Sequence, residues 1–488
     1  MLAAVILVCL ATVLTVILLF AASIFRKRRP GEPPVVAGSL LWGSAADFSR
    51  HAVNFLHKCR SVYGDVFTLR LVNQYITIVM DPHSIEALSK ERNFDFDPIQ
   101  KQVNWNVFNF SLVEPKKMIK DTGRTVRGTY MKRGMTSYVD NLNMACDDMH
   151  PDNNNVTEEW AAEGLRDFAA KTIFDALFNS IFGRQQSSAT FSSQKVYENF
   201  EVFHEYFNYL WLGVPKKCFP AAMKALGGLL AQPSADQLLA ADDTCDYIKN
   251  AIDYMRLHGQ SDSDIKGHNL VYLHVNYNTF RLAFWAINHV LEDPKAHEAL
   301  VAELREAVDA KVDSDNLATF TARDVEDLKI LDSVVQETCR LASGVFMVRY
   351  ITKDTQFEDS NGKTHLMRQG DRVAIYPPAI HKDPEIFDEP TVFKYDRFID
   401  ATFYKNGKEL RNPVIAFGTL CPGKRYALLQ LKWYLLTAFT RFDLRLQPGA
   451  KAEYDYRYHG HEVLPPVDDV NIDYRPRSEF ARLDFASE

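Results

Sequence analysis

The sequence contains no low-complexity segment and no internal repeat, and basic side chains are not in excess among its 488 residues. The formal net charge of -7 argues against nucleic acid as a partner, because nucleic-acid-binding proteins carry a basic surface. Hydrophobic residues make up 47% of the chain and aromatic residues 12%. This composition is sufficient for a large buried core.

Cysteine is scarce, and the seven cysteines are odd in number, scattered and without paired spacing. A small secreted protein held together by disulfides has an even and denser set, so a disulfide framework is excluded. The pattern indicates a reducing compartment. The cysteines are Cys9, Cys59, Cys146, Cys218, Cys245, Cys339 and Cys421.

The N-terminus carries an almost unbroken apolar run over residues 2–25, long enough to span a bilayer. A basic cluster over residues 26–29 follows it, whereas a cleaved signal peptide has its charge before the apolar core. The positive-inside rule then leaves the rest of the chain in the cytosol. We expect a single-pass transmembrane signal anchor at 1–25 in the endoplasmic reticulum membrane, a basic, proline-rich linker at 26–38 and a catalytic domain at 39–488.

Near the C-terminus, Cys421 lies between Gly418 and Gly423, just before apolar residues that recur at helical spacing from Tyr426 to Phe439. A thiol at the start of a helix is biased toward thiolate by the helix dipole and by backbone N–H groups. Glycine also lets a flat cofactor approach the backbone closely. The alternative for an isolated cysteine is an inert core residue.

Two further patterns precede this loop. Glu337 and Arg340 are spaced to share one helix face, and Arg397 within Phe393-Lys394-Tyr395-Asp396-Arg397-Phe398 offers a second guanidinium to the same carboxylate. In this order, E-x-x-R, F-x-x-x-R-F and F-G followed by C-x-G, the patterns resemble the haem-thiolate cytochromes of the cytochrome P-450 superfamily.

The resemblance covers almost the whole chain and implies a mainly α fold, a large helical haem domain with a small β-rich lobe. It implies haem b as cofactor, Cys421 as the axial iron ligand, and a buried triad of Glu337, Arg340 and Arg397. It also implies that Arg349, at the start of a strand, binds the cofactor by reaching a haem propionate. An exposed strand arginine is the alternative for Arg349.

The segment from His268 to Trp285 has helical periodicity and more polar groups than a core helix needs. In oxygen-activating members of the superfamily the corresponding helix carries an acid followed by threonine; here Asn278 and Thr279 occupy these positions. An amide cannot titrate, so Asn278 would donate a hydrogen bond rather than carry a proton. The alternative is an asparagine that serves only as a satisfied polar group of the core.

Within the superfamily, residues 29–34, 64–68 and 403–408 resemble the prostacyclin synthases and the sterol 12-alpha-hydroxylases. The first branch implies isomerisation of prostaglandin H2 to prostacyclin, a reaction of a lipid-derived substrate without dioxygen, NADPH or a reductase, with Asn278 binding the endoperoxide. Thr279 and the form of the loop at Cys421 keep open a sterol or lipid monooxygenase that needs NADPH and a reductase. The loop before Cys421 is shorter than in the family, so a haem-free relative is a third possibility.

Periodicity also predicts the supporting elements. Residues 65–71 and 75–80 alternate as the two strands of a hairpin, and amphipathic helices are expected from about 160 to 341, with a break at 259–264. Arg124 and Arg127 are expected to be surface charges.

Overall fold

The computed structural model describes residues 26–114, 117–118, 120, 123–149, 159–418, 421–458 and 462–486. The predicted anchor at 1–25 lies outside these residues, and no helix within them is both long and apolar enough to cross a membrane. The chain folds into two compact units, one rich in strands and one mostly helical. This division agrees with the large helical domain and small β-rich lobe expected from the sequence.

The strand-rich unit comprises Met1–Ile99, Val345–Asp388 and Phe403–Ile415. Its main sheet has the order β1-β2-β9-β6-β3, and two hairpins, β7-β8 and β10-β11, complete it. The strands are β1 (Val66–Leu71), β2 (Gln74–Val79), β3 (Phe94–Asp95), β6 (Met347–Ile351), β7 (Thr355–Glu358), β8 (Thr364–Met367), β9 (Arg372–Ile375), β10 (Phe403–Lys405) and β11 (Lys408–Leu410). The helices are α2 (Ala45–Arg50), α3 (Ala52–Tyr63), α4 (Ile85–Lys90) and α19 (Pro377–His381).

The predicted hairpin is confirmed, with Leu71 paired to Gln74 across a two-residue turn. Val72 in that turn has φ +59°, a conformation that a β-branched residue rarely adopts. The Arg70 guanidinium donates to the Val72 carbonyl at 2.7 Å and to the Leu40 carbonyl, also at 2.7 Å. One nearly buried cation therefore stabilises this turn and the neighbouring turn at residues 39–43.

The helical unit comprises Gln100–Gly344, Glu389–Thr402 and Ala416–Glu488. Its helices, with α5 beginning just before the division, are α5 (Asp97–Asn106), α7 (Gly128–Asp147), α8 (Leu165–Ala169), α9 (Asp175–Phe182), α10 (Ser193–Glu205), α11 (Phe207–Trp211), α12 (Pro220–Leu229), α13 (Ala235–Ala240), α14 (Asp246–Leu257), α15 (Asp262–Glu292), α16 (Pro294–Asp309), α17 (Ala322–Glu326), α18 (Lys329–Ala342) and α20 (Lys424–Arg441). A π-helical turn, Ala170–Phe174, joins α8 to α9. The strands are β4 (Ala161–Gly164), β5 (Leu317–Phe320), β12 (Phe442–Leu446), β13 (Asn471–Pro476) and β14 (Arg482–Phe485), paired as β12-β13-β4 and β14-β5.

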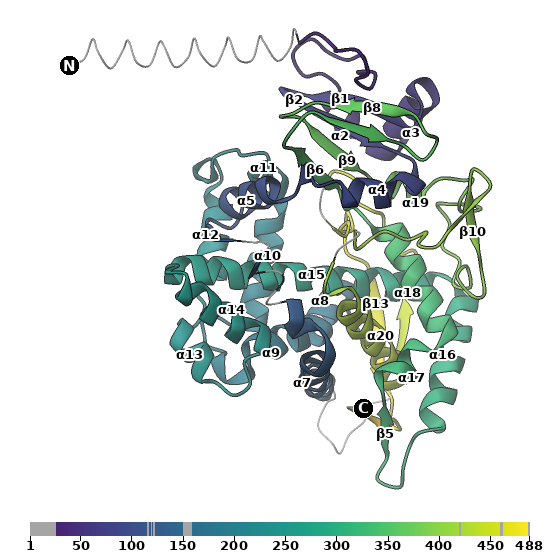
Figure 1. Ribbon diagram of the computed structural model, residues 1–488. Helices are drawn as coiled ribbons and strands as arrows, with labels where there is room; N and C mark the ends of the chain where they lie inside the picture. The colour runs from purple at the N-terminus through teal and green to yellow at the C-terminus, as the bar shows by residue number, and fades with distance from the viewer. Residues whose placement is uncertain are drawn as a thin grey trace. The chain divides into compact units, whose positions relative to one another are not determined.

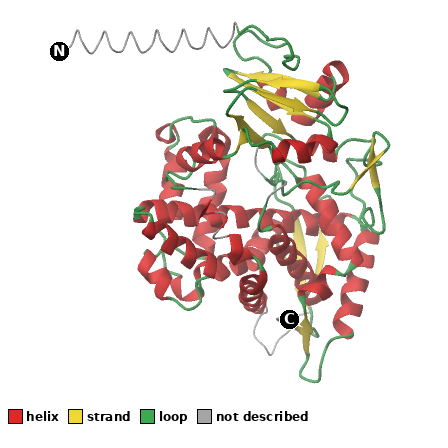
Figure 2. Cartoon of the chain, in the orientation of Figure 1, coloured by secondary structure: helices red, strands yellow, loops and turns green. Residues whose placement is uncertain are grey.

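The long helix α15 is central to this unit, and Figure 1 shows it running across the helical layer. It begins at a capping box, in which the Ser261 hydroxyl accepts from the Asp264 N–H and the Asp264 carboxylate accepts from the Ser261 N–H. Most of its side chains are buried, as expected for a helix that is surrounded by other helices. It packs against α16, α18 and α20. Figure 2 draws the helices of this unit in red and its strands in yellow.

The predicted helices are confirmed at His268 to Trp285, at residues 331–341 and after Cys421. The predicted break at 259–264 is confirmed only in its first part, because α14 ends at Leu257 and α15 already begins at Asp262. These segments were predictable because their apolar residues recur at the helical period, and α15 also begins at a capping box.

Candidate active site

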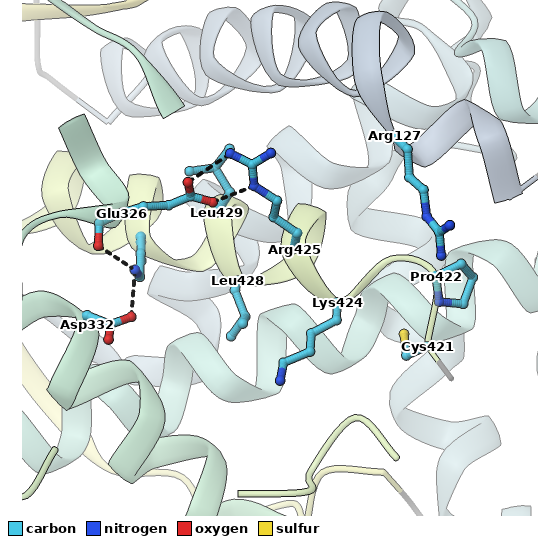
Figure 3. Close-up of a pocket in the computed structure, with 10 residues that line it drawn as sticks. Arg127, Glu326, Asp332, Cys421, Pro422, Lys424, Arg425, Leu428 and Leu429 are labelled. Atoms are coloured by element: carbon cyan, nitrogen blue, oxygen red, sulfur yellow. Dashed lines mark hydrogen bonds and ion pairs between the residues drawn. The ribbon is translucent and has the colours of Figure 1, made fainter. Parts of the chain in front are cut away.

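The Cys421 loop leads directly into α20, whose N-cap is Gly423. The Cys421 side chain is exposed to a pocket of about 470 Å³ in the helical unit. Figure 3 shows Cys421 and Pro422 at one end of this pocket, with Arg127 beside them and Lys424 and Leu428 farther along α20. The pocket is lined by Arg127, Glu326, Asp332, Cys421, Pro422, Lys424, Arg425, Leu428, Leu429 and Lys432.

The pKa of the Cys421 thiol is raised, chiefly because its surroundings remove water from the charged form. The backbone N–H groups of Gly423 and Lys424 interact with the sulfur and oppose this rise. The predicted bias toward thiolate is therefore wrong for the protein alone, because desolvation outweighs the helix end. A bound metal ion reverses this balance, since a coordinating thiol is deprotonated outright.

The predicted triad is present and buried. Arg340 donates two hydrogen bonds to the Glu337 carboxylate, both at 2.7 Å, and Arg397 Nε donates to Glu337 Oε1 at 2.9 Å. Glu337 and Arg340 on α18 are fully buried. Arg340 also donates to the Pro390 carbonyl at 2.6 Å. The triad thus ties α18 to the irregular segment 389–402 of the same unit.

The predicted residues Asn278 and Thr279 lie in the middle of α15. Val275 is 45% exposed although it lies midway along a largely buried helix, whereas Thr279 is buried. Asn278, one turn from Val275, is half-buried and donates from Nδ2 to the Val275 carbonyl at 3.3 Å. An apolar side chain that is open to space at this place indicates room beside α15 for a further group.

Arg281 had no predicted role from the sequence. It is buried, donates to the Val463 carbonyl at 3.2 Å and lies over the Tyr277 ring at 5.1 Å. It therefore fixes the segment around residue 463 against α15.

Sequence reasoning missed a buried histidine pair that joins α10 to α15. His204 Nε2 of α10 and His274 Nδ1 of α15 lie 3.0 Å apart, and the Phe207 ring stacks on His274. Burial lowers the pKa of His274 to about 4, so this imidazole is neutral at physiological pH. A single histidine in a helical sequence gives no sign of a partner 70 residues away.

Arg349 lies in β6 of the strand-rich unit, whereas Cys421, Asn278 and Thr279 belong to the helical unit. Its guanidinium donates to the Val348 carbonyl at 2.9 Å and lies 4.8 Å from the centre of the Phe96 ring. Burial lowers the pKa of Arg349. Its contact with a haem propionate stays a prediction.

Arg127, predicted to be a surface charge, is exposed, yet it lines the pocket at Cys421. The residues next to Arg127 in the sequence do not predict this position, because the segment that contains Arg127 meets Pro422 only in the folded chain.

The donor set fits a haem with one thiolate ligand. Cys421 presents an accessible sulfur with backbone N–H groups near it, and α15, with its opening at Val275, packs on α20 behind that loop. Arg340 and Glu337 anchor α18 beside the same two helices. The residues thus supply the ligand and a rigid frame around it.

Comparison with known proteins agrees with this geometry. The family model described as Cytochrome P450 matches residues 29–228 and 279–466. The chain is 29% identical to 7-alpha-hydroxycholest-4-en-3-one 12-alpha-hydroxylase of Oryctolagus cuniculus, an alignment that covers 93% of this chain and 95% of the relative. It is 28% identical to prostacyclin synthase of Rattus norvegicus (92% and 95% covered) and 26% identical to cholesterol 7-alpha-monooxygenase of Cricetulus griseus (92% and 94% covered).

These relatives include monooxygenases and a prostacyclin synthase, and the identities are too low to choose between their activities. The family match extends over most of the chain, including the Cys421 loop and the triad. Family members bind haem through an axial cysteine thiolate. The chain therefore belongs to the cytochrome P450 family.

Proposed function

We propose that the chain is a haem-thiolate isomerase of the prostacyclin synthase type, which converts prostaglandin H2 to prostacyclin without dioxygen or NADPH. The observation that carries the proposal is the absence of any carboxylate on α15 between Ile265 and Leu291, with Asn278 where oxygen-activating relatives hold an acid. Without an acid in this stretch, the helix lacks the group that would pass protons to bound oxygen, and an isomerase needs no such transfer.

When bound, a haem held by the Cys421 thiolate would supply the chemistry that cleaves the endoperoxide O–O bond. The side chains of α15 then have to hold the substrate in one orientation. Asn278 can donate from its amide nitrogen and accept at its amide oxygen, so it can bind one endoperoxide oxygen after leaving the Val275 carbonyl. Thr279 is buried beside it and needs to move no proton in this reaction.

A second candidate function is an NADPH-dependent monooxygenase that acts on a sterol or another lipid. Thr279 favours it, as do relatives whose names describe hydroxylases of sterols. In that case the partner is a reductase, and Thr279 rather than Asn278 becomes the critical side chain.

We also propose that the protein is a single-pass protein of the endoplasmic reticulum membrane with its catalytic domain in the cytosol. The apolar run at 2–25 and the basic cluster at 26–29 support this placement. A membrane location suits a substrate that is a lipid.

The direct test is to incubate the purified, haem-loaded protein with prostaglandin H2 in the absence of NADPH and reductase, and to measure prostacyclin as its stable hydrolysis product. The proposal predicts turnover that added NADPH and reductase do not change. Hydroxylation of a sterol that requires NADPH and reductase, with no conversion of prostaglandin H2, would support the monooxygenase instead.

A further inference from the structure

An aromatic cluster lies at the C-terminal end of α15, beyond the residues assigned above. The rings of Trp285 and Tyr454 are stacked with centroids 3.9 Å apart. His289, one helical turn after Trp285, stacks on Trp285 at 5.6 Å and on Phe393 at 4.8 Å. Trp285 and His289 are buried and Tyr454 is half-buried. All four residues belong to the helical unit.

A short hydrogen bond joins the two polar members of the cluster. Tyr454 Oη and His289 Nε2 are 2.6 Å apart. The other ring nitrogen, His289 Nδ1, lies 3.8 Å from Glu292 Oε2, three residues farther along the same helix. A carboxylate on this side favours the tautomer with its proton on Nδ1, which leaves Nε2 as the acceptor of the phenol proton.

We propose that Trp285, Tyr454 and His289 form a redox relay that returns one electron to the haem when a peroxide has oxidised it. The Trp285–Tyr454 pair gives up the electron, the haem is reduced by one equivalent, and the Tyr454 O–H bond breaks. The phenol proton goes to Nε2 of His289, so the products are a neutral tyrosyl radical and an imidazolium beside Glu292. A thiol or ascorbate in solution then returns one electron, and His289 returns the proton.

The surroundings of Tyr454 require this proton acceptor. Burial keeps the pKa of Tyr454 well above its ordinary value, so the residue starts as a neutral phenol. Removing an electron alone would leave a positive charge in a site of low polarity, which is costly. Transfer of the proton to His289 avoids that charge on the ring, and Glu292 stabilises the imidazolium that forms.

The cluster lies between Asn278 on one side and a half-exposed tyrosine on the other, so an electron can leave on one side and be replaced on the other. Trp285 is seven residues after Asn278 on α15, about 10 Å along the helix axis at about 1.5 Å per residue. On the other side, the Tyr456 ring is 6.1 Å from Tyr454 and half-exposed, so a small reductant can approach it.

The same contacts also have a structural consequence that the test must separate from the relay. Trp285 Nε1 donates to the Leu464 carbonyl at 2.7 Å, and Tyr454 pairs with Pro466 in an isolated β-bridge. The cluster therefore also fixes Tyr454 and Leu464 against α15. A purely structural role predicts changes in stability and no radical on Tyr454.

The experiment uses the full-length, haem-loaded protein mixed with cumene hydroperoxide, frozen within milliseconds to seconds and examined by electron paramagnetic resonance. Ring-deuterated tyrosine identifies a tyrosyl signal. The wild type is expected to show one, and Tyr454→Phe, which keeps the stacked ring, is expected to lose it. His289→Gln keeps a hydrogen-bond acceptor without a basic nitrogen, and the yield is expected to fall about tenfold, equivalent to about 1.4 kcal/mol in the barrier.

Tyr138→Phe is the matched control. Tyr138 is fully buried in the same unit, but its phenol donates to the Gln430 carbonyl at 3.1 Å, and a carbonyl cannot take the proton. This variant should leave the signal unchanged. An unaltered tyrosyl signal in Tyr454→Phe, or a wild type that forms no protein radical while the hydroperoxide consumes its haem, would overturn the proposal. The oxidant is a hydroperoxide rather than prostaglandin H2, so failure of the isomerase assay and failure of the relay are distinguishable.

Discussion

Asn278 and Thr279 are neighbours on α15 with different surroundings. Asn278 is half-buried, and its amide donates to the Val275 carbonyl of its own helix at 3.3 Å, a long distance for such a bond, whereas Thr279 is buried. A weakly bonded amide can exchange its backbone partner for a ligand at small cost. This difference makes the two positions a matched pair for testing the proposed isomerase.

The variant Asn278→Ala should slow prostaglandin H2 turnover, because it removes one neutral hydrogen bond to the substrate. Such a bond contributes about 0.5–1.5 kcal/mol, which corresponds to roughly a twofold to tenfold loss in kcat/KM. Thr279→Ala should leave turnover nearly unchanged. Steady-state kinetics on both variants checks this, and a larger loss in Thr279→Ala, accompanied by a requirement for NADPH, would indicate the monooxygenase.

At the residue scale, the sequence identified Cys421 because the motifs around it occur in a fixed order. It did not reveal that the pKa of the Cys421 thiol is raised, because the desolvation that raises it depends on packing by distant segments. The same reason explains why the His204–His274 pair and the place of Arg127 beside Pro422 were missed. Contacts between residues far apart in sequence leave no local pattern.

At the scale of elements, the buried charges of α18 provide the strongest test of the packing around the site. Glu337 and Arg340 are both fully buried, and Arg397 adds a second charge to the same carboxylate. Removing this acid would take away the carboxylate that pairs with two guanidinium groups in the interior.

Glu337→Ala should therefore prevent accumulation of the haem-loaded protein, with a loss of about 3–5 kcal/mol in the free energy of unfolding. Glu326→Ala is the matched control. Glu326 also makes a two-point pair with an arginine, Arg425, at 2.6 and 2.8 Å, but Arg425 is exposed. That control should cost about 1 kcal/mol or less. Equal thermal midpoints for the two variants would contradict the bracing role of the triad.

The buried histidines of α15 predict a pH dependence of stability. Burial lowers the pKa of His268 to about 4, while the unfolded chain keeps the ordinary value of 6.5. Between these two values the unfolded state binds more protons than the folded state, so stability falls as the pH falls from 6.5 toward 4. The full effect is up to about 3 kcal/mol.

Denaturant unfolding of the wild type and His268→Leu between pH 7 and pH 4 measures this dependence. The variant should lose stability less steeply with acidification, because its site cannot take up a proton. Parallel curves for the two proteins would show that His268 does not titrate differently in the folded and unfolded states.

Regular elements were the most predictable part of the chain. The helices α15, α18 and α20 follow from apolar spacing, and the β1-β2 hairpin from two short alternating segments joined by a turn. The left-handed Val72 at the hairpin turn was not predictable, because it depends on carbonyl contacts of Arg70 with two separate turns.

At the scale of the whole molecule, the described part of the strand-rich unit begins at Arg26, directly after the predicted anchor. Arg26 pairs with Asp371 at 2.5 Å and Arg29 with Asp354 at 2.6 Å, so the basic cluster is bonded to this unit. The turn held by Arg70 also presents three apolar side chains, Leu40, Leu41 and Trp42, each more than half exposed. Together these features support the proposed contact of the strand-rich unit with lipid.

Deleting residues 1–25 should therefore release the protein from membranes only in part. Sedimentation of membranes after a high-salt wash measures the bound fraction. Adding Leu40→Ser, Leu41→Ser and Trp42→Ser to the deletion should release most of the remainder. Full membrane retention of the deletion variant would show that the N-terminal run is not the main anchor.

The general architecture followed from the sequence through the resemblance of its motifs, and the comparison with the cytochrome P450 family confirms it. The division into two units, with strands collected from three separated segments, has no local signal in the chain. The choice between isomerase and monooxygenase lies in a few side chains and is decided by chemistry rather than by fold.

All the chemistry proposed for this chain depends on a thiolate from Cys421 bound to haem iron. The most direct measurement is the difference spectrum of the reduced protein with and without carbon monoxide, recorded for the wild type and for Cys421→Ser. Ligation by the Cys421 thiolate predicts the strongly red-shifted Soret band of a thiolate-bound haem in the wild type and its loss in the variant. A wild-type protein that carries no haem, or a red-shifted band that persists in Cys421→Ser, would contradict it.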